Sequence, residues 1–323
     1  MNTRTTRPLV ESALLAALGA VMMLIAWYVP VVGVVVGLVS PLPAAVAVIR
    51  HGTRWGIMSS VVTMLVMAPI VGIASALALW AINGAMGVSF GFAVRRNYRP
   101  TMVLATAAVG SLISVVVEYA SAYLILGLSL TKQFNEIITI WTQSLETTQK
   151  LLGPNPALDQ FLKTMPTADM MLAMAPALLF LAAFMLAYTN FEIFRRILPR
   201  LGYSLEPLPP FSRWIFPEFI AHAGIVAFLV PLLQGYIALP WLSRVAENVF
   251  IVASLLFIVE SLSAMMFYLL RSGISRGLAG FFAFIAISML FGAGPLGPLA
   301  TLFGMIDILF DFRHLRFEPV SEV

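Results

Sequence analysis

The sequence predicts an all-α, polytopic bundle of transmembrane helices, and three observations support this. Of 323 residues, 60% are hydrophobic and 11% charged, whereas about 25% of residues in an average soluble domain are charged. The apolar residues form continuous runs, unlike the short alternating segments of a β-barrel. The arginines stand between these runs. We therefore expect about eight full spans, a broken helical hairpin at the C-terminal end, and both termini in the cytoplasm.

The first two spans are expected between Arg7 and Arg50, where Glu11 is the single charged side chain. Polar residues do not recur there at every third or fourth position, as they would on a soluble core helix. The stretch breaks at Pro30 and Gly33, and each half can cross roughly 30 Å of hydrocarbon. Another apolar segment follows at once, so we expect a retained span and no signal peptide.

Apolar runs and their breaks place the remaining helices. The full spans are predicted at Leu9–Tyr28, Val31–Ile49, Trp55–Ile73, Ala76–Val94, Thr101–Leu128, Ala168–Leu198, Pro217–Tyr236 and Ala246–Leu270. The last run, Gly277–Phe312, is interrupted by Gly and Pro between Gly292 and Pro298, so we expect two half-spans there. The predicted organisation is a six-helix block over residues 1–198, a Pro-rich cytoplasmic linker over 199–216, and C-terminal membrane helices over 217–323.

The arginines agree with this topology. With a cytoplasmic N-terminus, 15 of 16 arginines fall inside, and only Arg244 and the three lysines fall outside, as the positive-inside rule requires. A single final span would place Arg313 and Arg316 outside, which also favours the broken hairpin. We therefore expect a multi-pass protein of the bacterial plasma (inner) membrane, with the lipid bilayer as its partner. The basic residues are dispersed between apolar runs, and membrane topology explains this pattern better than nucleic-acid binding.

The polar interval over residues 129–167 is the one substantial segment expected on the outer side. Phe134, Ile138, Trp141 and Leu145 recur at helical spacing among charged residues, which predicts an amphipathic helix. Two interpretations stay open. The helix either lies in the interface and covers the bundle, or acts as a lid over a substrate site.

Ionisable side chains inside spans are the candidates for function, because each costs roughly 2.5–3.5 kcal/mol at the bilayer centre. Glu118 is the deepest, with Tyr119 and Tyr123 on neighbouring faces, and Glu260 lies beside two serines in a later span. We predict that these four residues bind a ligand. The alternative is that the carboxylates hydrogen-bond to neighbouring helices and only fix their packing.

Asp307, Asp311 and Arg313 close the last half-span, and we expect Asp311 and Arg313 to form a solvated or paired terminus. An intramembrane enzyme would require Glu118, Glu260 and Asp307 to converge on one polar cavity. The chain has no phosphate loop, zinc motif, dinucleotide turn or nucleophile elbow. It has no cysteine and three histidines. We expect no enzyme, no metal and no cofactor, and any energy for transport would come from a partner.

Three stretches resemble the YybS-like family of predicted bacterial membrane proteins. They are R-P-L-V-E-S-A-L-L-A-A-L from Arg7, P-L-P-A-A-V-A-V-I-R-H-G-T-R-W-G from Pro41, and D-I-L-F-D-F-R-H-L-R from Asp307. The resemblance extends over nearly the whole chain and implies a polytopic membrane protein, but no reaction.

The first half is also similar to the substrate-capture (S) subunits of energy-coupling-factor transporters. That resemblance implies docking on a transmembrane coupling subunit, itself driven by ATPases, through small residues of the first helix. The matching positions are Ala13, Ala16, Ala17 and Ala20. Small residues four apart let helix backbones approach closely, so packing within the chain is the alternative.

The leading functional hypothesis is therefore a transport-related protein of the capture type. It would bind a small molecule from the outer side and rely on a partner for energy. The alternative is a non-transport membrane scaffold linked to envelope growth or division, in which the buried carboxylates only specify helix packing.

Overall fold

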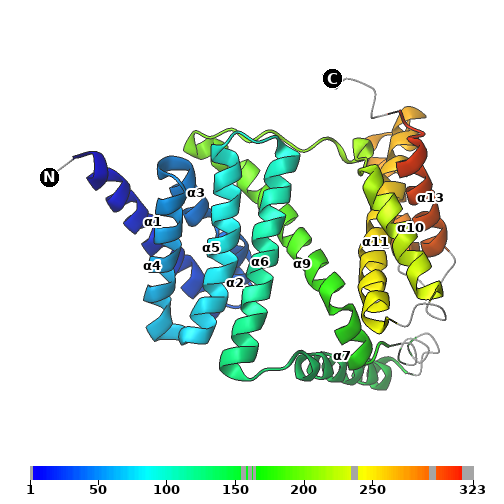
Figure 1. The fold of residues 1–323 in the computed structure, drawn as a ribbon, viewed down its shortest axis with the longest axis horizontal. Helices are drawn as coiled ribbons and strands as arrows, with labels where there is room; N and C mark the ends of the chain where they lie inside the picture. The colour runs from blue at the N-terminus through cyan, green and yellow to red at the C-terminus, as the bar shows by residue number, and fades with distance from the viewer. Residues whose placement is uncertain are drawn as a thin grey trace. The chain divides into compact units, whose positions relative to one another are not determined.

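The computed structural model describes residues 3–153, 158, 162, 165–233, 239–290 and 296–314. Throughout this part of the chain the regular secondary structure is helical, as the continuous apolar runs predicted (Figure 1). The chain divides into two compact units, unit 1 over Met1–Pro207 and unit 2 over Leu208–Val323. The division falls within the Pro-rich segment predicted as a linker.

Unit 1 follows the predicted order of helices. Its elements are α1 Thr3–Tyr28, α2 Val32–Val39, α3 Leu42–His51, α4 Thr53–Val71, α5 Ile73–Arg95, α6 Pro100–Leu126, α7 Leu130–Leu152, α9 Ala168–Ile197 and the 3₁₀ turn η1 Leu198–Leu201. Most of these bounds lie within a few residues of those expected. Long helices form because the runs are apolar along their whole length and Gly or Pro stands between them.

The second predicted span is two helices and not one. α2 ends at Val39, and α3 begins after Pro41, which has no N–H to continue the α-helical ladder. The Ser40 hydroxyl donates to the carbonyl oxygen of Gly37 at 2.6 Å and closes the end of α2. The continuous apolar run concealed this break, because hydrophobicity alone does not register a missing backbone donor.

The interior of unit 1 is built from small side chains. A Cβ on Gly91 of α5 would lie 2.6 Å from the carbonyl oxygen of Ala45 in α3, so the two backbones touch there. Phe90 and Phe194 add an edge-on ring pair whose centroids are 4.9 Å apart. Helices in membranes pack in this way because apolar burial alone does not drive them together in lipid.

Residues 130–152 form helix α7, so the helix predicted in the polar interval is confirmed. Ser129 caps it by accepting a hydrogen bond from the Lys132 N–H. Phe134 packs with Ala168 and Ala175 of α9, whereas Trp141 on α7 is 48% exposed. One face of α7 therefore covers α9, while part of the apolar surface of α7 remains exposed. The choice between an interfacial helix and a lid stays a prediction.

Unit 2 is arranged around one long helix. Its elements are the 3₁₀ turn η2 Phe211–Arg213, α10 Glu218–Leu232, α11 Pro240–Arg271, α12 Arg276–Leu290 and α13 Leu296–Phe310. α11 packs against α10, α12 and α13, and it begins six residues before the predicted Ala246. The interval between α12 and α13 falls in the predicted break, of which residues 291–295 lie outside the described part of the chain.

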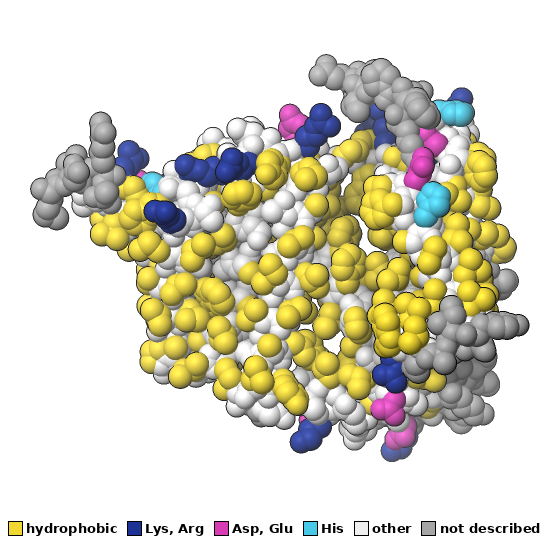
Figure 2. Space-filling model, viewed as in Figure 1, with side chains coloured by type: hydrophobic (Ala, Val, Ile, Leu, Met, Phe, Trp, Pro, Cys, Tyr) yellow, Lys and Arg dark blue, Asp and Glu magenta, His cyan; other side chains and the backbone are white. Residues whose placement is uncertain are grey.

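Seven helices of the described chain are long and apolar enough to cross a membrane, counting α2 and α3 together, and α10, α12 and α13 are shorter. Large apolar side chains are exposed on the outside of these helices, such as Leu14 (66%), Val34 (70%) and Leu124 (77%). Figure 2 shows apolar side chains over the flanks of the helices and basic ones at the ends of the helices of unit 1. These features identify an integral membrane protein. The count of eight spans and the cytoplasmic termini stay predictions.

Candidate functional site

A cluster of fully buried charged side chains lies in unit 2. It joins Glu260 and Ser263 of α11, Asp307 of α13, and Arg313, which follows α13; we call these four residues the charged cluster. The side chains of Arg313, Glu260 and Asp307 are 0% exposed. Asp311 ends α13 with a φ of 44°, and this left-handed turn folds the chain back so that Arg313 reaches the cluster.

Oxygen atoms surround the Arg313 guanidinium. Its Nε donates to Asp307 Oδ2 at 2.9 Å, and its Nη2 lies 2.8 Å from the same oxygen and also donates to Glu260 Oε1. Its Nη1 donates to Ser263 Oγ at 2.7 Å. The carbonyl oxygens of Ser212 and Trp214 accept at 3.3 and 2.8 Å. Every nitrogen of the group is therefore paired, as a buried cation requires.

The charged cluster also fixes the segment that leads into α10. Ser263 Oγ donates to the carbonyl oxygen of Phe211 at 2.7 Å. The N–H of Phe216 donates to Glu260 Oε2 at 3.1 Å. Part of the predicted linker, residues 211–216, is thereby attached to α11 and α13, so the cluster connects three segments of unit 2 that are far apart in the sequence.

Of the two alternatives predicted for Arg313, a solvated or a paired terminus, the structure has the paired one. Its partners are Glu260 and Asp307. Asp311 is also buried, at 4% exposure. One feature of the sequence indicated a buried ion pair. A lone carboxylate at position 260 inside a span is costly, so it needs a partner. Arg313, 53 residues away in sequence, could not be chosen as that partner before α11 and α13 were placed side by side.

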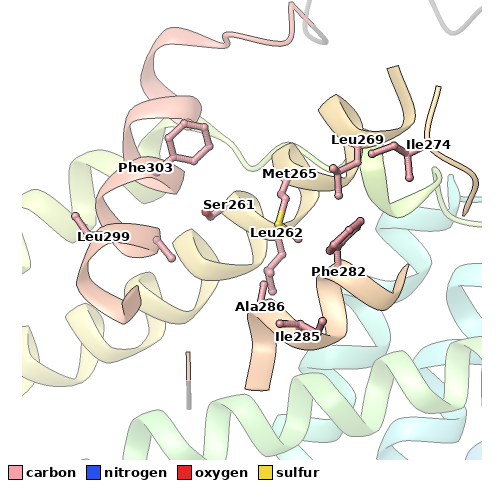
Figure 3. Close-up of a pocket in the computed structure, with 11 residues that line it drawn as sticks. Ser261, Leu262, Met265, Leu269, Ile274, Phe282, Ile285, Ala286, Leu299 and Phe303 are labelled. Carbon is pink, nitrogen blue, oxygen red and sulfur yellow. The ribbon is translucent and has the colours of Figure 1, made fainter. Parts of the chain in front are cut away.

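A cavity of about 600 Å³, widely open to the outside of the helices, lies between α11, α12 and α13. Figure 3 shows side chains from these three helices, and that of Ile274 between α11 and α12, around it, with the Ser261 hydroxyl as the one polar group among the lining side chains. The lining residues are Ser261, Leu262, Met265, Leu269, Ile274, Phe282, Ile285, Ala286, Leu299, Ala300 and Phe303. Glu260 and Asp307 do not line it. The two carboxyl groups converge on a guanidinium, while the neighbouring cavity is apolar.

The ligand residues predicted in unit 1 lie on the outside of α6. Glu118 and Tyr123 have exposed side chains, Tyr123 at 61%, and Tyr119 is half-buried. Glu260, the fourth predicted ligand residue, belongs to the charged cluster of unit 2. Ligand binding by Glu118, Tyr119 and Tyr123 stays a prediction for a surface and not for an enclosed site.

The four predicted docking alanines of α1 fall on two faces. Ala16 and Ala20 are 1% and 4% exposed, and the Thr63 hydroxyl of α4 donates to the Ala16 carbonyl at 3.0 Å. These two residues therefore serve packing within unit 1. Ala13 and Ala17 are exposed, and partner docking stays a prediction for them alone.

The ionic contacts at the beginning of α1 were not predicted from the sequence. Glu11 lies 2.9 Å from His51 Nε2, 2.8 Å from Arg7 Nε and 3.5 Å from Arg50 Nη1. Arg95 of α5 donates to the carbonyl oxygens of residues 48 and 49 at 3.1 and 3.0 Å. These contacts bring the basic ends of α1, α3 and α5 together, as the arginine pattern predicted. The cytoplasmic location of this end stays a prediction.

Comparison with known proteins agrees with a membrane assignment. Residues 17–308 match the protein family described as "Predicted membrane protein (DUF2232)". The chain is also similar to "Uncharacterized protein YybS" of Bacillus subtilis (strain 168), with 24% identity over 318 residues, which cover 96% of this chain and 99% of that protein. No solved structure matches significantly. The resemblance to YybS-like proteins is confirmed, while similarity to substrate-capture subunits is not shown.

Proposed function

Because the chain belongs to the DUF2232 family of predicted membrane proteins, we propose that it binds a lipid-like small molecule within the membrane, as the binding component of a transport process. The observation that carries this proposal is the apolar cavity between α11, α12 and α13. Its volume of about 600 Å³ lies within the range of roughly 300–1,000 Å³ that is usual for small-molecule sites.

The lining restricts the chemical class of the ligand. A charged or polyhydroxylated molecule would lose its hydration and meet one hydroxyl group, that of Ser261, which leaves its remaining polar groups unpaired at a cost of kilocalories each. An apolar body with one hydrogen-bonding group would lose little hydration and gain contact along the whole wall. The cavity therefore favours an acyl or isoprenoid-like molecule over a water-soluble substrate.

The proposal is one of binding and not of catalysis. The carboxyl groups of Glu260 and Asp307 are occupied by Arg313 and do not line the cavity. The sequence has no phosphate loop, so a partner would supply energy for transport. The exposed face of α1 that carries Ala13 and Ala17 is the surface we propose for such a coupling subunit, because small residues permit close helix contact.

Filling the cavity tests the proposal. We expect the wild-type protein, purified in mild detergent, to retain a lipid-like molecule detectable by native mass spectrometry. In Ala300→Trp the indole would occupy the space beside Phe303, and we expect retention to fall about tenfold, since displaced apolar contact of one side chain is worth roughly 1.5–3 kcal/mol.

The matched control is Ala283→Trp. Ala283 is a half-buried alanine of α12 that does not line the cavity, so this variant should retain the wild-type amount. Equal retention in both variants would contradict the cavity as the binding site. If no small molecule is retained by any form of the protein, the scaffold hypothesis is favoured. A loss in Glu118→Gln with normal retention in Ala300→Trp would move the site to α6.

A further inference from the structure

Helix α7 carries three different strips of side chains around its circumference. The first strip packs on α9, where Phe134 is buried against Ala168 and Ala175. Ala168 is the first residue of α9 and Ala175 stands about two turns further on, so α7 crosses α9 at its beginning. This contact uses roughly a third of the circumference of α7, at 3.6 residues per turn. The other two strips face away from α9.

The second strip is apolar and exposed, and we call it the apolar strip. Its large side chains are those of Ile137, Ile140, Trp141 and Leu151. The hydroxyl groups of Ser144 and Thr148 lie between them and donate to carbonyl oxygens of α7 itself, each at 2.8 Å. Neither hydroxyl therefore depends on water for a hydrogen bond. Leu151 is 79% exposed, and contact of such a strip with water would be unfavourable.

The third strip is polar, and we call it the charged strip. Its members are all exposed, and they are Lys132, Asn135, Glu136, Thr139, Gln143, Glu146, Thr147 and Lys150. Charged and amide groups of this kind need water or a polar partner. Because two lysines stand beside two glutamates, the charged strip has no net charge.

Helix α7 runs across the ends of two spans and not along them. α6 ends at Gly127, whose φ of 65° turns the chain out of the helix. Figure 1 shows α7 lying crosswise to α6 and α9, where α6 ends and α9 begins. Both of these helices are long and apolar enough to cross a membrane. Their ends therefore place α7 at the level where hydrocarbon meets water.

We propose that α7 binds the membrane itself, as an interfacial helix whose apolar strip inserts among the lipid chains while its charged strip faces water. Trp141 suits this level, where tryptophan is enriched in membrane proteins. The charged strip has no net charge, so the attraction is hydrophobic and does not require anionic lipid. Neither the cavity nor the charged cluster of unit 2 enters this assignment, so it stands independently of the proposed function.

Spin labelling of the full chain tests the assignment. The chain has no cysteine, so each introduced cysteine carries a nitroxide at one known position. In phosphatidylcholine bilayers we expect labels at Ile137→Cys and Leu151→Cys to collide more with lipid-soluble oxygen than with a water-soluble nickel chelate. The matched controls are Thr139→Cys and Gln143→Cys in the charged strip. The oxygen-to-nickel ratio should be about tenfold lower there, because hydrocarbon leaves the polar groups of the chelate without hydrogen bonds.

Three results would overturn the assignment. Equal ratios in the two strips would mean that water surrounds α7 on both sides. Labels of the apolar strip that are shielded from both reagents would mean that protein covers it, as in a lid or in contact with a second copy. A ratio that rises only when anionic phosphatidylglycerol is added would mean attraction by charge and not insertion. The assignment requires the same ratios with and without phosphatidylglycerol.

Discussion

Replacing Arg313 with glutamine is expected to destabilise unit 2 by roughly 3–5 kcal/mol, because it leaves the buried carboxyl groups of Glu260 and Asp307 without their cation. The same change removes the donors to the carbonyl oxygens of Ser212 and Trp214. The connecting segment 211–216 should then detach from α11. Hydrogen exchange measured by mass spectrometry would locate the effect: protection should fall in peptides of residues 211–216 and α13, and remain unchanged in α1–α6.

Two comparisons make this expectation specific. Arg276 at the start of α12 is exposed, so Arg276→Gln should change the stability by no more than about 0.5 kcal/mol. Adding Glu260→Gln to Arg313→Gln removes one of the two carboxyl groups left without Arg313 and should restore about half of the loss, because the charge and not the missing contact dominates the cost. A double variant as unstable as the sum of the two single changes would contradict this explanation.

The helices could be predicted because a membrane span is specified by local composition. α4, for example, covers Thr53–Val71, and the apolar run predicted Trp55–Ile73. The predicted bounds are wrong where a missing backbone donor ends a helix, or where a helix continues past the apolar run. Pro41 divides a run that is apolar throughout, and α11 begins at Pro240 although Arg244 and Glu247 lie in its first turns. Charged residues interrupt an apolar run without ending the helix.

The candidate site could be predicted only in part. The cost of burying a carboxylate identified Glu260 and Glu118 alike, yet Glu260 is enclosed by unit 2 and Glu118 is exposed on α6. That cost shows that a partner is needed, but it does not identify the partner or its direction. Arg313 contributed to the topology prediction as one of many arginines, and its role depends on the crossing of α11 and α13.

The second large effect is expected at that crossing. Gly304 of α13 lies against the backbone carbonyl of Phe257 in α11, so closely that a Cβ on Gly304 would overlap the carbonyl oxygen. Phe257 and Ile308 are both buried in the unit 2 core. A flexible side chain could move aside, but a backbone carbonyl inside α11 cannot move without disturbing its helix.

We therefore expect Gly304→Ala to separate α13 from α11 and to destabilise unit 2 by roughly 1–3 kcal/mol or more. The matched control is Gly280→Ala in α12, where an added Cβ meets open space and alanine favours a helix by up to about 1 kcal/mol. Thermal unfolding in detergent should lower the midpoint for Gly304→Ala and leave it equal or higher for Gly280→Ala. Because the charged cluster needs α11 and α13 in contact, Gly304→Ala should also increase hydrogen exchange at residues 211–216, as Arg313→Gln does. An unchanged midpoint in Gly304→Ala would mean that α11 and α13 do not cross at this residue.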